Sequence, residues 1–316
     1  FGEGPFDLGT TVSTGLMPFA ESSDPAVAAV SGKGVKIVGA GTVKITASQA
    51  GDSNYLPAEP VQQTLIVNKA PSRVDLSGLE HIYDGKPRPA GAKTDPRGLT
   101  VIMTYEGSER LPVNAGSYQV VATVRDANYE GSASATMTIA KAPQKITFKA
   151  LKARTFGDAD LSPGAMASSK IPVSYVSSNT GVAEITGDKL HIVGAGTAVI
   201  TASQAGDSNY LAAEPVQQTL MVNKAPATVT LGGLDQTYDG KPKAASALTT
   251  PAGLKVTIAY DGKDAVPVNA GSYPVVGTVQ DANYEGNAKA TMRIARAPQT
   301  ITFDALAAKT FGDVEF

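Results

Sequence analysis

The sequence predicts an all-β protein made of tandem β-sandwich modules, and three observations lead to this prediction. Residues 38–71 return almost unchanged as residues 193–226, at an offset (Gly39 to Gly194) that holds without insertion elsewhere. Apolar and polar residues alternate in short segments, which is the pattern of half-buried strands, and no window sustains a helical period. The 32 glycines and 20 prolines of the 316-residue chain punctuate these segments as turns.

Composition excludes several classes of function. Hydrophobic residues make up 42% of the chain but aromatic residues only 6%, which suits several small cores better than one large core. With a formal net charge of −2, the chain lacks the excess of basic residues that is typical of nucleic-acid-binding proteins. We expect no membrane span in this segment, because no apolar run approaches about 18 residues, and we expect no signal peptide. With no cysteine, disulfides, thiolate metal sites and cysteine catalysis are excluded.

Proline-containing joints divide each repeat into two kinds of module. Module A ends at Asn68-Lys69-Ala70-Pro71 and again at residues 223–226, and module B ends at residues 140–143 and 295–298. Each module has about 70 to 80 residues, which is within the range of independently folding domains. The predicted order is a first A module lacking its first strand (1–69), a first B module (70–142), a second A module (143–224), a second B module (225–297) and the first strand of a following A module (298–316).

The strands can be placed from the alternation. In the first B module, Val120, Ala122 and Val124 alternate with polar or exposed neighbours. A comparison of the two copies agrees with this placement. At a position placed inward, Val43 of one copy corresponds to another apolar residue, Ala198, whereas at a position placed outward the charged Lys44 corresponds to Val199. Such sheets have one wet face, and five to seven short strands in a small module fit a two-sheet sandwich. In the second A module we expect strands near 145–150, 171–177, 182–186, 188–193, 197–203 and 215–222.

Residues 114–118 (Asn-Ala-Gly-Ser-Tyr) return as residues 269–273 and stand before an alternating strand. They resemble the tyrosine corner of immunoglobulin-like domains, in which a Tyr hydroxyl bonds to upstream backbone. The resemblance implies structural roles for Tyr118 and Tyr273, with buried rings and hydroxyls bonded to backbone. The predicted fold class is therefore all-β, with tandem immunoglobulin-like β-sandwich modules forming an elongated rod.

Module motifs extend this resemblance to nearly the whole chain. Residues 177–185 (Ser-Ser-Asn-Thr-Gly-Val-Ala-Glu-Ile) and the Gly194-Ala195-Gly196-Thr197 turn resemble bacterial Ig-like repeats of the Big family. Residues 83–85 (Tyr-Asp-Gly), 114–118 and 126–131 (Asp-Ala-Asn-Tyr-Glu-Gly) resemble MBG/YDG-type repeats of bacterial surface proteins. These resemblances imply a long extracellular adhesin or surface fibre at the bacterial cell surface, in which such modules serve as stalk.

No set of residues predicts catalysis or a cofactor. His81 and His191 are the only histidines, and their counterparts are Gln236 and Lys36, so both are interpreted as solvated surface residues. Residues 126–131 begin like an EF-hand loop, but Met137 stands where the loop needs a bidentate Glu; a looser calcium site remains an alternative to a simple turn.

Other motifs also have structural interpretations. Gly39-Ala40-Gly41-Thr42 lacks the Lys and the helix of a phosphate loop, so its glycines are assigned to a tight turn. No serine has a partner histidine at a repeated position. Lys69 and Lys224, beside Asn68 and Asn223, are conceivable isopeptide donors but lie at joints. We predict no enzyme activity, no cofactor, no metal site and no catalytic residue.

We expect a structural segment that acts as a stalk or spacer. Each module should contact mainly its neighbours, and proline at every joint should make the joints semi-rigid. The alternative is an adhesion module that binds host or cell-surface glycan or protein through exposed loops. Near-identity of the two copies favours the generic spacer.

The two ends of the chain carry parts of the same A module. The second A module opens with residues 144–151, a predicted strand whose Ile146 and Phe148 enter the core. The equivalent residues 299–306, with Ile301 and Phe303, are separated from the first A module by three modules of roughly 30 to 40 Å. We expect Ile301 and Phe303 to complete an A module beyond this chain, by covalent continuation or by strand complementation of a neighbouring copy. Both imply a head-to-tail arrangement and, unless a ring closes, a fibre.

Overall fold

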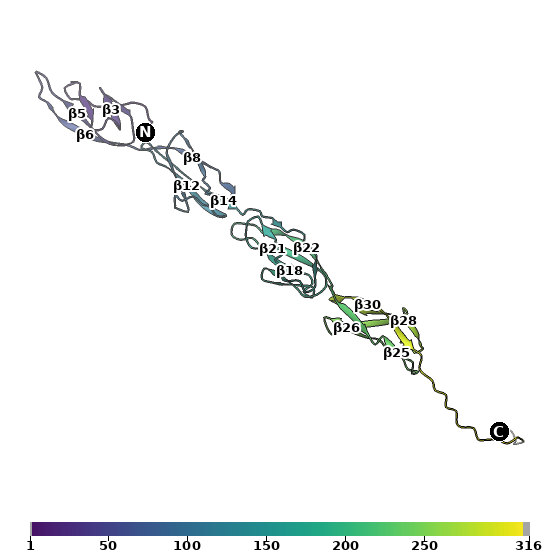
Figure 1. Cartoon of the computed structure of the whole chain (residues 1–316). Coiled ribbons are helices and arrows are strands. Elements are labelled where there is room, and N and C mark those ends of the chain that lie inside the picture. The colour runs from purple at the N-terminus through teal and green to yellow at the C-terminus, as the bar shows by residue number, and fades with distance from the viewer. Residues whose placement is uncertain (1, 312–316) are drawn as a thin grey trace. The chain divides into compact units, whose positions relative to one another are not determined.

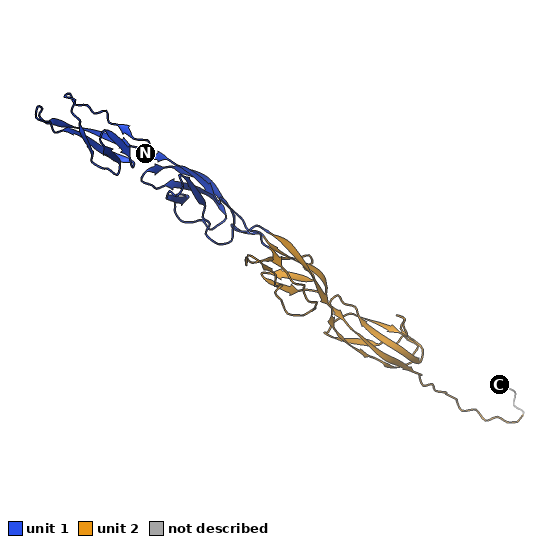
Figure 2. Cartoon of the chain, turned by 90° about the horizontal axis from the view of Figure 1, so that it is seen from above, with its two compact units in different colours: residues 1–144, 205–212 blue, residues 145–204, 213–316 orange. Residues whose placement is uncertain are grey.

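The computed structural model describes residues 2–311, and every regular element among them is a β-strand. The chain forms two compact units (Figure 2), one of residues 1–144 and 205–212 and one of residues 145–204 and 213–316. Strand pairing and cores confirm the predicted β-sandwiches (Figure 1). The module names are kept as sequence labels, and their boundaries remain predictions. Nowhere in the described part is there a helix with the length and hydropathy needed to cross a bilayer.

In unit 1, the first A module is built around the long strand β5. Sheet β2-β5-β6 packs against sheet β1-β4-β3, and all pairs are antiparallel. Val43 and Ile45 on β5 point into the core, whereas Thr42 and Lys44, which alternate with them, are exposed, as period-two alternation requires. The strands are β1 (Phe6–Asp7), β2 (Phe19–Ser22), β3 (Ala28–Ser31), β4 (Gly34–Ile37), β5 (Gly41–Gln49) and β6 (Ala58–Val67).

The first B module, also in unit 1, has a four-stranded sheet, β11-β12-β14-β9, and a two-stranded sheet, β10-β8. Val120, Ala122 and Val124 on β12 are buried, as predicted, together with Met137 and Ile139 on β14. The strands are β7 (Ala70–Pro71), β8 (Arg73–Ser77), β9 (Glu80–Ile82), β10 (Gly91–Asp95), β11 (Val101–Tyr105), β12 (Gly116–Val124), β13 (Tyr129–Glu130) and β14 (Ser132–Ala140).

In unit 2, the second A module has a four-stranded sheet, β16-β22-β21-β18, with the pairs β15-β17 and β19-β20. Its core contains Ile146 and Phe148, so the predicted entry of both side chains is confirmed. The strands are β15 (Ile146–Thr147), β16 (Arg154–Thr155), β17 (Met166–Ala167), β18 (Ser174–Ser177), β19 (Ala183–Thr186), β20 (Lys189–Ile192), β21 (Gly196–Gln204) and β22 (Ala213–Asn223).

Two predicted strands of this module are shorter than expected. The strand expected at 145–150 is paired only as β15, although Phe148 beyond it is still buried. The strand expected at 171–177 begins at Ser174, and Pro172, which has no N–H for a ladder, lies outside it.

The second B module repeats the first within unit 2, with sheets β25-β30-β28-β27 and β24-β26. Val275, Met292 and Ile294 form its core. After β30, residues 296–311 form an exposed segment without strands (Figure 1). The strands are β23 (Ala225–Pro226), β24 (Thr228–Gly232), β25 (Asp235–Thr237), β26 (Ser246–Thr250), β27 (Val256–Tyr260), β28 (Gly271–Val279), β29 (Tyr284–Glu285) and β30 (Asn287–Ala295).

Candidate functional site at the module joints

A four-residue loop of the pattern Asp-x-Asn-Tyr occurs in every module and folds on itself. In the loop at residues 126–129, Asp126 Oδ1 accepts the N–H groups of Asn128 at 2.8 Å and Tyr129 at 3.1 Å. The loops at 52–55, 207–210 and 281–284 have the same two bonds. A carboxylate that holds the next backbone N–H groups fixes an Asx turn locally. The loop therefore has its shape before it meets another module.

The loop of the first B module makes three hydrogen bonds at the joint, two to the first A module and one to Ala70 just after it. The N–H of Ala40 donates to Asn128 Oδ1 at 2.8 Å, across 88 positions of sequence. The N–H of Ala70 donates to the Asn128 carbonyl oxygen at 2.8 Å, and Lys69 Nζ donates to the Asp126 carbonyl oxygen at 2.6 Å. The last bond is charge-assisted and is stronger than a neutral one. We call this arrangement the clasp.

Unit 2 contains the same clasp between its own A and B modules. The N–H of Ala195 donates to Asn283 Oδ1 at 2.8 Å, and the N–H of Ala225 to the Asn283 carbonyl oxygen at 2.8 Å. Lys224 Nζ donates to the Asp281 carbonyl oxygen at 2.6 Å. Lys69 and Lys224, considered as isopeptide donors, thus have a role in the clasp.

A third clasp lies within unit 1, where a loop of the second A module packs on the first B module. The N–H of Ala115 donates to Asn209 Oδ1 at 2.9 Å, and the N–H of Ala142 to the Asn209 carbonyl oxygen at 2.9 Å. Lys141 Nζ donates to the Asp207 carbonyl oxygen at 2.7 Å. One device therefore serves both an A-to-B and a B-to-A joint.

Aromatic pairs accompany the clasps. In unit 1 the rings of Tyr83 and Tyr210 meet edge to face, with centroids 5.3 Å apart. In unit 2 Phe156 and Tyr284 meet in the same way at 5.4 Å. Such pairs add roughly 0.5 to 1.5 kcal/mol beyond the area they bury. Each pair joins an A-module residue to a B-module residue.

Close backbone approach explains the glycine before the alanine in the A modules. A Cβ on Gly39 would stand 2.7 Å from the Ala26 carbonyl oxygen and 3.1 Å from Asn128 Oδ1. A Cβ on Gly194 would stand 2.6 Å from the Gly181 carbonyl oxygen. Any side chain here would push the turn away from its partner loop. The tight-turn assignment for Gly39 was therefore incomplete, because this glycine also keeps the joint closed.

The structural tyrosines lie at the corner of the B modules. Tyr118 hydroxyl donates to the Asn114 carbonyl oxygen at 2.8 Å, and Tyr273 hydroxyl to the Asn269 carbonyl oxygen at 2.7 Å. Both rings are half-buried, which corrects the expectation of full burial. One side of each ring packs on the core, while the bonded hydroxyl lies at the exposed end of the module.

The histidines have local partners. His81 Nε2 donates to the Gly78 carbonyl oxygen at 2.8 Å, and its counterpart Gln236 makes the same bond to Gly233 at 2.9 Å. An amide replaces the imidazole there, so no imidazole chemistry is needed. His191 Nδ1 lies 2.6 Å from Asp160 Oδ1 in an exposed pair.

The carboxylates of the proposed looser calcium site are occupied by the loops themselves, since Asp126 and Asp281 hold backbone N–H groups. Among residues 2–311 no group of three or more His, Cys, Asp or Glu side chains is placed to hold a metal ion.

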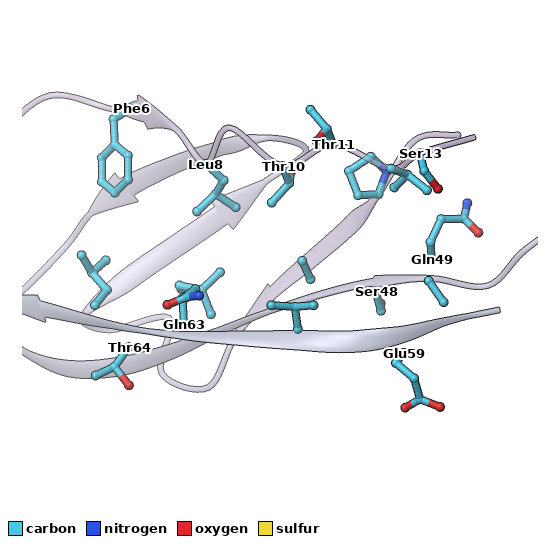
Figure 3. Close-up of a pocket in the computed structure, with 17 residues that line it drawn as sticks. Phe6, Leu8, Thr10, Thr11, Ser13, Ser48, Gln49, Glu59, Gln63 and Thr64 are labelled. Carbon is cyan, nitrogen blue, oxygen red and sulfur yellow. The ribbon is translucent and has the colours of Figure 1, made fainter. Parts of the chain in front are cut away.

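The first A module has an open groove at a place that is filled in the second A module. The groove has a volume of about 520 Å³ and is lined by β5, β6 and the segment before β2. Phe6 and Leu8 point across it toward the strand that carries Gln63 (Figure 3). In the second A module the equivalent wall packs on Ile146 and Phe148. The predicted structural residues Ile301 and Phe303 are 91% and 77% exposed.

The clasp was missed at the sequence level. From the sequence, residues 126–131 are interpreted as a simple turn, with a looser calcium site as the alternative. A signal was available, because the pattern stands in both module types although they differ elsewhere, and each joint carries Lys or Arg before Ala-Pro. The sequence does not identify the hydrogen-bond partner of Asn128, because Ala40 is distant in sequence and contributes only its backbone N–H.

Comparisons with solved structures give only likeness of fold. The chain is similar to Drosophila N-cadherin EC1-4, with 12% identity, 93% of this chain and 94% of that chain covered, and a TM-score of 0.27. It is similar to domains 1-6 of the surface layer protein SbsC, with 14% identity, 93% and 50% coverage and a TM-score of 0.23. For Sidekick-1 immunoglobulin domains 1-5 the identity is 15%, the coverage 93% and 77%, and the TM-score 0.28. No curated protein sequence matches the chain.

A family model identifies part of the chain more directly. The MBG domain model matches residues 72–143 and 227–298. These ranges coincide with the two modules that carry the tyrosine corner and one Asp-x-Asn-Tyr loop each. The resemblance of the B modules to MBG-type repeats is therefore confirmed, and the Big-type character of the A modules stays a prediction. The second and fourth modules of this chain therefore match the MBG domain over nearly their whole predicted length.

Proposed function

We propose that the chain is a non-enzymatic spacer segment of an extracellular bacterial surface protein, arranged head to tail with further copies of the same repeat. The observation that carries the proposal is the recurrence of the clasp. Asn128, Asn209 and Asn283 each make the same pair of hydrogen bonds, although the modules on either side differ. Because the same hydrogen bonds recur where the neighbouring modules differ, their role is to hold a joint between modules and not to stabilise one type of module.

The clasp suits a spacer because it opposes bending at a joint. Each joint is crossed by the covalent chain, by the Asn side chain and by the Lys side chain, at separate points. A net contribution of about 1 kcal/mol per hydrogen bond makes an open joint a minor state when two or three bonds must break together. The proline after each Lys-Ala pair restricts the backbone further.

The absence of enzyme activity is part of the proposal and is supported by how the polar residues are used. The repeated carboxylates hold turns, the repeated lysines hold joints, and His81 is replaceable by glutamine. The prediction of a surface location rests on two resemblances, one to Big-type repeats and one to MBG-type repeats. The MBG matches support the second of these resemblances and, with it, the surface location.

The proposal can be tested by measuring a distance across one joint. Ser31 and Glu109 are exposed, lie in the two modules of unit 1, and can be changed to Cys for nitroxide labelling in a chain with no native cysteine. Double electron–electron resonance should give a narrow distance distribution. The Asn128→Ala, Lys69→Ala double variant should broaden it, because two of the three clasp bonds are lost.

Asn209→Ala is the matched control, since it removes the same bond at another joint and should leave this distribution narrow. A distribution that is already broad in the unaltered chain would contradict the spacer proposal.

A further inference from the structure

We propose that each B module resists pulling along the chain, so that the spacer has the further function of carrying tension. The inference rests on the proposed spacer function and says which force the spacer withstands. Its evidence is the direction in which the first and last strands of a module pair. Two separate sets of hydrogen bonds join these strands, and a pull along the chain acts on both sets.

The last strand of each B module runs parallel to an early strand of the same module. β30 pairs in parallel with β25 in unit 2, and β14 pairs in the same way with β9 in unit 1. The N–H of Arg293 donates to the Leu234 carbonyl oxygen at 2.7 Å, and the N–H of Tyr238 to the Ala295 carbonyl oxygen at 2.9 Å. The equivalent bonds of unit 1 are 2.7 and 2.9 Å long. We call this contact the exit pairing.

A second parallel contact lies where the chain enters the module. The short strand β23 pairs in parallel with β29, and β7 pairs in the same way with β13 in unit 1. Beyond the bond from Ala225 that belongs to the clasp, the N–H of Ala227 donates to the Glu285 carbonyl oxygen at 2.7 Å. The equivalent bond of unit 1 is 2.8 Å long. We call this contact the entry pairing.

The parallel direction decides how a pull acts on these bonds. Residues 225–238 and 283–295 are two lengths of chain joined by the entry pairing and the exit pairing. A pull along the chain draws them in opposite directions, so they must slide past each other before the module can open. The bonds of a ladder run from strand to strand, across this sliding, and therefore break together. If the two lengths were antiparallel, the pulled ends would lie side by side and the bonds would break one after another.

A glycine keeps the entry pairing close in both B modules. A Cβ on Gly286 would overlap the Ala227 carbonyl oxygen, and a Cβ on Gly131 would overlap the Ser72 carbonyl oxygen. Neither glycine has a φ in the left-handed region, so its backbone conformation does not itself require glycine. The close approach of the two lengths of chain is what requires the absence of a side chain.

The second A module has the same kind of exit pairing within unit 2. Its last strand, β22, pairs in parallel with β16, and the N–H of Phe156 donates to the Asn223 carbonyl oxygen at 2.9 Å. The smaller sheets of the A and B modules differ, but the parallel pairing of the last strand is common to both. The shared feature is thus the one through which a pull passes to the next module.

Single-molecule force spectroscopy on the full chain tests the inference. The chain has no native cysteine, so handles can be attached to cysteines placed at exposed residues. Handles at Glu214→Cys and Asp304→Cys pull the second B module from its two sides and shear both pairings. Handles at Lys241→Cys and Asp304→Cys pull at one end of the exit pairing and peel it. At one constant force, unfolding should be at least about fivefold slower in shear, because at least one more hydrogen bond must break in the same step.

Two alanine variants separate resistance to shear from general stability. Gly286→Ala should open the entry pairing and make unfolding about fivefold faster in shear, by loss of the bond between Ala227 and Glu285. It should leave the peeling rate unchanged, because peeling starts at the exit pairing. Gly253→Ala is the matched control. With a φ of 86° at Gly253, alanine strains this turn, but the turn lies outside both pairings, so the rate in shear should stay the same.

Three outcomes would overturn the inference: equal unfolding rates in the two pulling geometries, equal acceleration of both by Gly286→Ala, or equal acceleration in shear by the two alanine variants. If Gly286→Ala does not fold, the comparison of shear with peeling in the chain without it still decides. The spin-label distance between positions 31 and 109 is measured without force. Failure of the spacer proposal would therefore be seen separately.

Discussion

Loss of one side-chain amide should loosen one joint and leave its twin intact. Asn283→Ala removes the Oδ1 that accepts the Ala195 N–H at 2.8 Å. The loop should keep its shape, because Asp281 Oδ1 holds the N–H groups of residues 283 and 284 at 2.7 and 3.0 Å. The loss is then one partly buried hydrogen bond, about 1 kcal/mol. Exchange of the Ala195 amide hydrogen with solvent should become about fivefold faster.

Hydrogen exchange followed by NMR can read this directly in the full chain. The Ala40 amide, held by Asn128 in the twin joint of unit 1, is the internal control and should exchange as before. An unchanged exchange rate of the Ala195 amide hydrogen would show that the hydrogen bond to Asn283 Oδ1 does not hold the turn. Equal acceleration at Ala40 would show a general loss of stability, and the reasoning about a local clasp would be wrong.

Three further predictions follow from single groups. Tyr118→Phe should lower the free energy of unfolding of the first B module by about 1 kcal/mol in urea, by loss of the bond to Asn114; no change would leave the corner without a stabilising role. The hydrogen bond from Lys243 lowers the pKa of the Asp239 carboxyl, so this contribution to stability is present above the unfolded pKa and is lost as the pH falls through the folded one. Lys243→Met should return that pKa toward its ordinary value in an NMR titration, and an unaltered value would contradict the assignment. EDTA should leave the melting temperature unchanged, whereas a fall of more than about 5 °C would reveal a calcium site.

The fold could be predicted because each module repeats a local pattern. Alternation along β12 and β14 places Val120, Met137 and Ile139 inward without knowledge of any distant partner. The repeat then supplied an independent check, since inward Val43 and Ala198 are both 2% exposed. Where the chain departs from simple alternation, as before β18 with Pro172, the predicted strand boundary was wrong.

The contacts at the joints could not be predicted in the same way, because the residues in contact are far apart in the sequence and some contribute only backbone atoms. Asn128 bonds to a backbone N–H that every residue except proline possesses, 88 positions away. No periodicity reports such a contact. Gly39 is equally ambiguous in sequence, since a glycine between strands is explained by a turn until the neighbouring Ala26 carbonyl oxygen is seen.

The clasp explains how neighbouring modules are joined. It does not explain which type of module is joined to which. It uses the N–H of an alanine and a loop present in all modules, so it admits A and B modules on either side. Choice between partners must come from groups outside it. The ring pairs differ, Tyr83 with Tyr210 in one kind of joint and Phe156 with Tyr284 in the other. The loop contributes a tyrosine in both pairs, and a module of either type carries this tyrosine, so the ring pairs, like the clasp, do not choose between A and B modules. Alternation of A and B is then set by the covalent order of the modules in the chain, while the clasp supplies the joint that both kinds share.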